Sequence, residues 1–596
     1  MIRWILIGLL LTLSIATGVA NETPKHEMRA AWMATAVKDF PVQSYSLGQQ
    51  MEIRADLNKL KAAGFNTVIF QVRPGCDAFY DSNYEPWSHL LMGASGLAPD
   101  APYYDPLGYL ITEAHARGME VHAWFNPFRL STLSDLTKLH DTHVYKEHPE
   151  WVMNYTKSTY KWLNPGLREV REYTVDVIMD VVNRYDVDGI HMDDYFYPYE
   201  GMDNEDAPQF NADPRGFSNI ADWRRDNINS FVEALYDSIK SQKSWVKLGI
   251  SPFGIWKDGT PQGITGLSSY KVIYCDPLAW LDGGYIDYLT PQLYWPFGGS
   301  QNYGALMPWW AEQTGEAGRH LYVGHASYRI TTPTGSWLNG WNPNELPRQI
   351  RANRNNPAVQ GSVYFRLLRG ILDNPKGFQD SLKQDLYKYP ALVPGMTWLD
   401  SIAPNPPTRL SWEVSGESKI LSWLAPHAAV DGDTAFQYAI YRSETTPVDV
   451  DLASNILDVI PATRQTYTDN TVGDFYYTVT ALDRLKNESS PHPTVSLDQI
   501  VEVPDEFILY PNFPNPFNPT TTISFALSDA QEVRLSIYDI SGSHVMDLYT
   551  GYLGAGKHAF QFDARMGEGY SLPTGVYLAR LETRTASQVQ RMLLLK

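Results

Sequence analysis

Short apolar runs alternate with longer amphipathic segments between residues 28 and 390. Eight of the runs are rich in β-branched and aromatic residues and are predicted strands, at residues 28–35, 66–73, 119–126, 187–194, 247–252, 285–294, 320–326 and 361–366. Strands that alternate with helical segments predict an α/β fold, with a parallel sheet closed into a (β/α)8 TIM barrel. A doubly wound open sheet is the alternative, but no glycine-rich phosphate loop follows the first run.

Two of the intervening helices carry clear signals for a start or a stop. Apolar residues at helical spacing precede Gly64, which predicts that one helix stops after Ala63. Asn164 and Pro165 offer an N-cap and a favoured first-turn proline to another helix, whose apolar face is Val170, Val177 and Val181.

The chain beyond the barrel changes to short alternating runs separated by turn residues. A proline-rich linker at residues 401–407 opens a segment that predicts a small β-sandwich over residues 402–497, with a pattern that resembles fibronectin type III. Residues 504–596 predict a second small β-sandwich. The predicted order is therefore a barrel over residues 28–390 followed by two all-β domains.

Composition describes a folded, acidic, multi-domain protein. The 596 residues are 43% hydrophobic and 19% charged, and the net charge of −19 argues against nucleic acid or an anionic membrane surface as a partner. A basic Arg3, an apolar run and a small-residue exit ending at Ala20 predict a signal peptide over residues 1–20. A membrane anchor would need a longer apolar span. We therefore expect an exported monomer, in which Cys76 and Cys275 either pair or remain buried thiols.

Candidate chemistry gathers at the end of the fourth predicted strand. Asp193 and Asp194 end that strand, and Tyr195, Phe196 and Tyr197 follow at once. Active sites of barrels lie at the carboxyl ends of the strands. Sugar hydrolysis needs a proton donor, an anion beside an oxocarbenium-like centre, and flat faces for pyranose rings. The pattern therefore predicts a glycoside hydrolase, with Asp194 as general acid and Asp193 as nucleophile or charge stabiliser.

The identity of the second catalytic carboxylate is left open, because adjacent residues rarely place two carboxyls on opposite sides of one bond. Asp287, in the sixth predicted strand, is the alternative third catalytic residue, and a loop residue such as Glu200 is a further alternative for the proton donor. No cofactor is expected. The residues expected to bind a polysaccharide substrate share positions at or near strand ends, and they are Arg73, Asn126, His191, Tyr195, Tyr197, Gln292, Tyr294 and Trp295.

Two other function classes compete with the hydrolase. A metal-dependent polysaccharide deacetylase could use His191, Asp193 and Asp194, but such sites need about three convergent ligands and no second histidine-rich motif lies at a strand end. A non-catalytic cell-surface glycan-binding protein is the other alternative. The presence of both aspartates argues against it.

Long stretches of the barrel region resemble a known family. The runs FNTVIFQVRPGCDAFYDS, DPLGYLITEAHARGMEVHAWFNPFR, VDGIHMDDYFYP and IDYLTPQLYW resemble the glycosyl hydrolase-like 10 family, which includes hydrolases of peptidoglycan glycan strands. The resemblance implies a substrate that is rich in amino sugars.

The last segment carries a second resemblance. It contains LYPNFPNPFNPTT, IYDISG and LPTGVYLARL, which resemble the type A C-terminal sorting domain of the type IX secretion system, apart from an inserted Phe513-Pro514. This resemblance implies that the secretion machinery is a partner. It also implies a location at the cell surface or outside the cell, reached through the periplasm.

Overall fold

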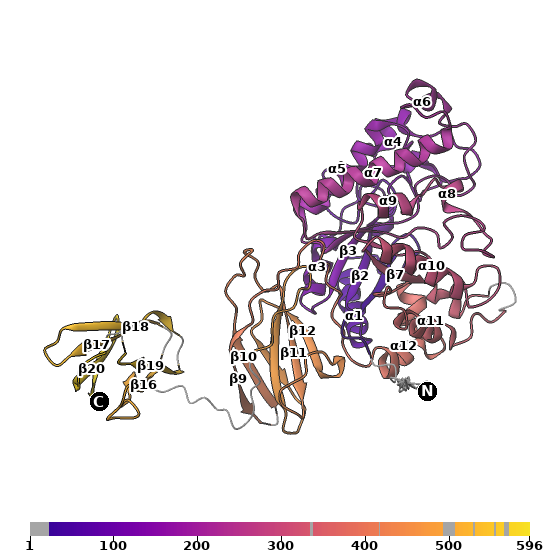
Figure 1. Cartoon of the computed structure of the whole chain (residues 1–596). Helices are drawn as coiled ribbons and strands as arrows, with labels where there is room; N and C mark the ends of the chain where they lie inside the picture. The colour runs from indigo at the N-terminus through magenta and orange to yellow at the C-terminus, as the bar shows by residue number, and fades with distance from the viewer. Residues whose placement is uncertain are drawn as a thin grey trace, which may run out of the picture. The chain divides into compact units, whose positions relative to one another are not determined.

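The computed structural model describes residues 23–333, 338–416, 418–492, 507–528, 531–553, 556–565 and 571–596. The predicted signal peptide, residues 1–20, lies outside these ranges. The chain divides into two compact units, Met1–Val495 and Ser496–Lys596 (Figure 1). Within the described ranges, no helix is both long and apolar enough to cross a membrane.

Eight parallel strands close into a barrel in sequence order, and β1 pairs with β8 to complete the ring. Every strand falls within one of the predicted runs, which confirms the TIM barrel. The strands are β1 (Met28–Met33), β2 (Thr67–Arg73), β3 (Glu120–Phe125), β4 (Gly189–Met192), β5 (Lys247–Ile250), β6 (Tyr288–Leu289), β7 (His320–His325) and β8 (Gly361–Tyr364).

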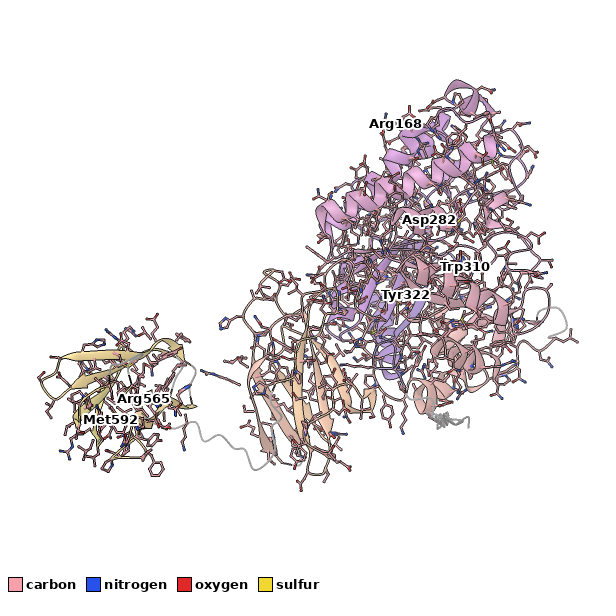
Figure 2. All side chains as sticks on the ribbon, viewed as in Figure 1. Arg168, Asp282, Trp310, Tyr322, Arg565 and Met592 are labelled. Carbon is pink, nitrogen blue, oxygen red and sulfur yellow. The ribbon has the colours of Figure 1, made fainter. Side chains whose placement is uncertain are left out.

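Helices surround these strands (Figure 1). They are α1 (Ser46–Ala62), α2 (His89–Met92), α3 (Pro106–His115), α4 (Val144–Glu147), α5 (Arg168–Arg184), α6 (Ala207–Ala212), α7 (Ile220–Gln242), α8 (Ser269–Val272), α9 (Pro277–Gly283), α10 (Tyr303–Glu316), α11 (Glu345–Arg354) and α12 (Phe378–Ser381). Figure 2 labels Trp310 on α10 and Tyr322 on β7.

The two predicted helix signals have different outcomes. Helix α1 ends at Ala62, and Gly64 has a φ of +81°, as a glycine stop requires. Helix α5 begins only at Arg168, so the predicted N-cap at Asn164 is wrong. The Asn164 side chain instead accepts a hydrogen bond from the backbone N–H of Gly166 at 2.9 Å, which closes a turn before the helix.

Aromatic and imidazole rings fill part of the barrel interior, and two glycines leave room for them. A Cβ on Gly249 would lie 1.9 Å from the Tyr288 ring, and one on Gly189 would lie 2.9 Å from the His122 ring. Any larger residue on β4 or β5 at these positions would displace the rings, because interiors of this kind are close-packed.

The first unit also contains a β-sandwich made of two three-stranded sheets, ordered β13-β10-β9 and β12-β11-β14. Its strands are β9 (Thr408–Ser415), β10 (Ser418–Leu424), β11 (Gln437–Ser443), β12 (Ile456–Pro461), β13 (Thr466–Asp469) and β14 (Tyr476–Leu482). Lys486, just after β14, reaches the amino-terminal end of the barrel and lies 3.3 Å from Glu120 on β3. The sandwich therefore supplies a charge to the floor of the barrel.

The second unit is an all-β sandwich with sheets ordered β15-β16-β19 and β18-β17-β20-β21. Its strands are β15 (Ile508–Leu509), β16 (Thr520–Leu527), β17 (Gln531–Asp539), β18 (His544–Leu553), β19 (Gly556–Asp563), β20 (Gly575–Thr583) and β21 (Ser587–Leu594). Met592, labelled in Figure 2, belongs to its buried core. The predicted class, a TIM barrel followed by small all-β domains, is confirmed.

Candidate active site

A cavity of about 170 Å³ opens among residues at the carboxyl-terminal ends of the barrel strands. Asp193 follows β4, Ser251 follows β5 and Gln292 lies beyond β6, so the strand ends bring distant parts of the chain to one place. Its walls include Trp32, Trp124, Tyr195, Tyr199, Tyr294 and Phe365. The cavity is thus a polar base with aromatic sides, the kind of site that small molecules and sugars occupy.

The aspartate pair forms the acidic part of this cavity. The backbone N–H of Asp194 donates to Asp193 Oδ1 at 2.8 Å, and Gln292 Nε2 approaches the same oxygen at 3.4 Å. The Tyr199 hydroxyl donates to Asp194 Oδ1 at 2.6 Å. Asp193 retains 9% of its surface exposed and Asp194 retains 2%. Both carboxyls are therefore held in fixed positions by neighbours on the cavity wall.

The two carboxyls differ in how they hold a proton. Burial raises the pKa of Asp194 well above its ordinary value, and the negative charge of Asp193 and the hydrogen bond between the two side chains raise it further. Burial also raises the pKa of Asp193, but hydrogen bonding from Asp194 and the positive charge of Arg129 oppose that rise. The pKa of Asp194 is therefore raised more than that of Asp193, which favours Asp194 as the acid and Asp193 as its anionic partner.

Aromatic rings and a guanidinium group complete the walls. The Arg129 guanidinium lies 4.4 Å from the centre of the Tyr195 ring. Tyr294 and Phe365 are stacked, with centroids 6.2 Å apart and planes 9° apart. The indole N–H of Trp124 is hydrogen-bonded to the Asp193 carboxyl, which opposes the rise in the pKa of Asp193 that burial causes. The walls therefore offer flat apolar faces together with hydrogen-bonding capacity for a bound ligand.

Four of the predicted substrate-binding residues line the cavity, namely Asn126, Tyr195, Gln292 and Tyr294. Asn126 is held in place by its own bonds, since its side chain donates to Pro74 O at 3.1 Å and accepts from Gln71 Nε2 at 3.4 Å. The positions of the four suit contacts with sugar hydroxyls and rings, and their role in binding stays a prediction.

Asp287 and Arg73 lie away from the cavity, contrary to expectation. Asp287 precedes β6 at the amino-terminal end of the barrel, where Lys240 Nζ and the backbone N–H of Leu248 each donate to its Oδ2 at 2.7 Å. It cannot reach the same bond as Asp193 and Asp194. Arg73 is fully buried and forms an ion pair with Glu85 at 2.5 Å, so it stabilises the strand ends from outside the cavity.

Three further predicted residues are also placed outside the cavity. Tyr197 is fully buried and its hydroxyl accepts from Asn227 Nδ2 at 3.2 Å. Trp295 is half-buried and does not line the cavity. His191 lies within the barrel, where burial holds its pKa well below the ordinary value. Its two ring nitrogens contact Trp32 and Tyr288, so neither is available to a metal ion at the aspartates.

Sequence reasoning missed Trp32, Trp124 and Arg129, which line the cavity. Period-two alternation along β3 places Trp124 on the same face as Asn126, so the alternation could have identified it. The same alternation applies to Trp32 on β1. Arg129 lies in the loop beyond β3 and carries no such signal. Both cysteines, which the sequence left unassigned, are free and buried.

A parallel eight-stranded barrel with a buried carboxyl pair and aromatic walls at its carboxyl-terminal mouth has the features of the barrel glycoside hydrolases. The chain matches the model of the glycosyl hydrolase-like 10 family over residues 27–339. It belongs to that family, as the resemblance predicted. Residues 515–587, in the second unit, match the FlgD Ig-like domain.

Two relatives extend the match beyond the family model. The chain is 40% identical over 492 residues to Glycosyl hydrolase YngK of Bacillus subtilis (strain 168), covering 79% of this chain and 93% of that protein. It is 36% identical over 368 residues to Glycosyl hydrolase DigH of Escherichia coli (strain K12), covering 57% and 82%. The glycoside hydrolase domain of PgaB (BpsB) from Bordetella bronchiseptica covers 61% of this chain and 99% of that domain at 11% identity, with a TM-score of 0.41, too low to carry an argument.

Proposed function

We propose that the protein is a glycoside hydrolase that cleaves an amino-sugar-rich polysaccharide, with peptidoglycan glycan strands as the preferred substrate. The observation that carries the proposal is the buried pair Asp193 and Asp194 in an aromatic-walled cavity at the mouth of the barrel. Membership of the glycosyl hydrolase-like 10 family supports the reaction class. The family resemblance of the barrel motifs supports the substrate.

The roles follow from protonation and position. Asp194 gives its proton to the oxygen of the scissile glycosidic bond, because a carboxyl with a raised pKa remains an acid near neutral pH. Asp193 stabilises the positive charge that develops at the anomeric carbon. Tyr199 holds the acid in place through its 2.6 Å hydrogen bond. Tyr294 and Tyr195 offer faces for pyranose rings, and Gln292 and Asn126 offer amide groups to hydroxyls.

We propose that the protein is exported. We propose that residues 1–20 direct export and that the second unit is a sorting domain of the type IX secretion system. The motifs quoted from residues 509–582 and the all-β fold of that unit support this role. The sandwich over residues 402–497 is proposed to be of the fibronectin type III kind. Deletion of residues 504–596 is expected to retain the protein in the periplasm, which fractionation with immunoblotting would measure.

Catalysis is tested with the purified full-length chain and peptide-stripped sacculi. We expect new reducing ends and soluble glycan fragments, identified by mass analysis. Asp193→Asn and Asp194→Asn should each remove most of the turnover, whereas Asp282→Asn, an exposed position on α9 (Figure 2), should not change it. Near-normal turnover in both site variants would contradict the assignment. Binding of strands without release of fragments would indicate a glycan-binding protein instead.

A further inference from the structure

Two adjacent residues, Asp193 and Asp194, supply the carboxyl groups that line the cavity. Among the described residues that line the cavity, only the adjacent residues Asp193 and Asp194 carry carboxylates, and the backbone N–H of Asp194 donates to Asp193 Oδ1 at 2.8 Å. Glycosidases that use two protein carboxyls hold them roughly 5–5.5 Å apart for retention and roughly 6.5–9.5 Å apart for inversion, one on each side of the bond. Two carboxyls on adjacent residues at one strand end lie on the same side of the scissile bond.

Carboxylates elsewhere on the barrel are held by other groups. Glu85 is paired with Arg73 at 2.5 Å, and Asp287 is bonded at the opposite end of the barrel. Glu345 Oε1 accepts from the backbone N–H of Phe297 at 3.0 Å. Among the described residues, no carboxyl other than Asp193 and Asp194 lines the cavity, where it could attack the anomeric carbon or activate water.

Most of the other side chains that line the cavity are aromatic. They include Trp32, Trp124, Tyr294 and Phe365. Walls of this kind suit a small neutral group with an apolar methyl and a polar amide. The 2-acetamido group of an N-acetyl amino sugar has this chemistry, and its carbonyl oxygen is a known alternative to a protein nucleophile in glycoside hydrolysis.

We propose that the cleavage is substrate-assisted: the 2-acetamido group of the sugar beside the scissile bond is the nucleophile, and Asp193 orients it instead of attacking. The inference rests on the proposed hydrolase function and narrows its substrate to glycans whose reacting sugar is N-acetylated. Asp193 retains 9% exposure, so its carboxyl oxygen can accept a hydrogen bond from the acetamido N–H.

The steps balance without any further reagent. The acetamido carbonyl oxygen bonds to its own anomeric carbon while the bond from that carbon to the leaving oxygen breaks, and the Asp194 proton passes to the leaving oxygen. The cyclic oxazolinium cation that forms lies beside two carboxylates. Water then adds to the anomeric carbon, its proton returns to Asp194, and the ring bond to the amide oxygen breaks. Two displacements at one carbon retain the anomeric configuration.

The experiment compares three forms of peptide-free glycan strands with the full-length protein: native, chemically N-deacetylated, and re-acetylated. We expect native and re-acetylated strands to be cleaved and deacetylated strands to be cleaved at least about 10²-fold more slowly, a modest part of what an intramolecular nucleophile supplies. Early products should keep the anomeric configuration by NMR. Rapid quenching followed by mass analysis should find no sugar ester on Asp193.

Variants of Asp193 distinguish a role in orienting the acetamido group from a role as the nucleophile. Asp193→Asn should lower kcat about 10²–10³-fold, the loss seen when one electrostatic stabiliser is removed, with a smaller change in KM, and Asp282→Asn should change neither. An inverted product, a sugar ester on Asp193, or equal cleavage of deacetylated strands would overturn the inference while leaving the hydrolase intact. Failure to cleave native strands at all would instead remove the proposed function, and the inference with it.

Discussion

The ion pair beneath the barrel gives a quantitative test of how the first sandwich supports the site. Lys486, which follows the sandwich strand β14, places its Nζ 3.3 Å from Glu120, and each side chain is 1% exposed. Lys247 contacts the same carboxylate at 2.6 and 2.7 Å. Burial alone would raise the pKa of Glu120, but the two lysines and a hydrogen bond from His122 hold it well below its ordinary value. We expect Lys486→Met to destabilise the whole first unit.

The expected loss of stability in Lys486→Met follows from the distance between the Lys486 ammonium and the Glu120 carboxylate. Unit charges 3.3 Å apart attract by about 5 kcal/mol at an effective dielectric constant near 20. Repulsion between the two lysines and the cost of burying Lys486 offset part of this attraction. Because Lys247 remains beside Glu120, we expect a loss of about 3 kcal/mol, the lower end of the range for breaking a buried ion pair.

Urea unfolding followed by tryptophan fluorescence measures this loss, and a cycle with Glu120→Gln isolates the coupling. Lys61→Met is the matched control, because Lys61 on α1 pairs with Asp458 of the same sandwich at 2.8 Å while 31% and 27% exposed. Half-exposed pairs contribute less than about 1 kcal/mol. Equal losses in the two variants, or a Glu120–Lys486 coupling below about 0.5 kcal/mol, would refute the reasoning.

Three other predictions concern the acid and the packing beneath it. Tyr199→Phe removes the hydrogen bond from Tyr199 to Asp194 and should raise the pKa of the acid further. The high-pH limb of the kcat/KM profile should therefore move to higher pH, and an unmoved limb would contradict this. Asp194 has a higher pKa folded than unfolded, so its ionisation costs stability as pH rises; Asp194→Asn should therefore melt higher than wild type at pH 8 but not at pH 3. Gly249→Ala should cost about 3 kcal/mol or more in urea because its Cβ meets Tyr288 at 1.9 Å, whereas Gly315→Ala in α10, with its nearest contact at 3.4 Å, should be close to neutral or stabilising.

Periodicity was sufficient to predict the barrel, because each parallel strand is buried on both faces and appears as a short apolar run bounded by turns. The position of Asp193 and Asp194 also followed from the sequence, since strand ends converge at the mouth of any such barrel. These two inferences needed only local pattern and a general rule of topology.

Side-chain direction beyond a strand end could not be predicted in the same way. Tyr197 and Tyr195 are two residues apart in one aromatic run, yet one is fully buried and the other lines the cavity. Asp287 lies within the predicted sixth strand, but it precedes the observed β6 by one residue, which places it at the amino-terminal end of the barrel. Because the predicted strand over 285–294 was longer than the observed one, the sequence alone did not locate that end.

A chain of hydrogen bonds runs from the amino-terminal end of the barrel to the cavity. The groups at its two ends determine which atom donates in each bond. The indole N–H of Trp32 can only donate, so His191 Nε2 accepts it at 3.1 Å and His191 Nδ1 carries the proton toward the Tyr288 hydroxyl at 3.0 Å. Tyr288 therefore donates to His122 Nδ1 at 2.7 Å, and His122 Nε2 donates to Glu120 at 3.2 Å. A donor-only group at the top and an ionised carboxylate at the bottom leave one consistent arrangement. The lysines that keep Glu120 ionised thereby also hold in place the ring of Trp32 that lines the cavity.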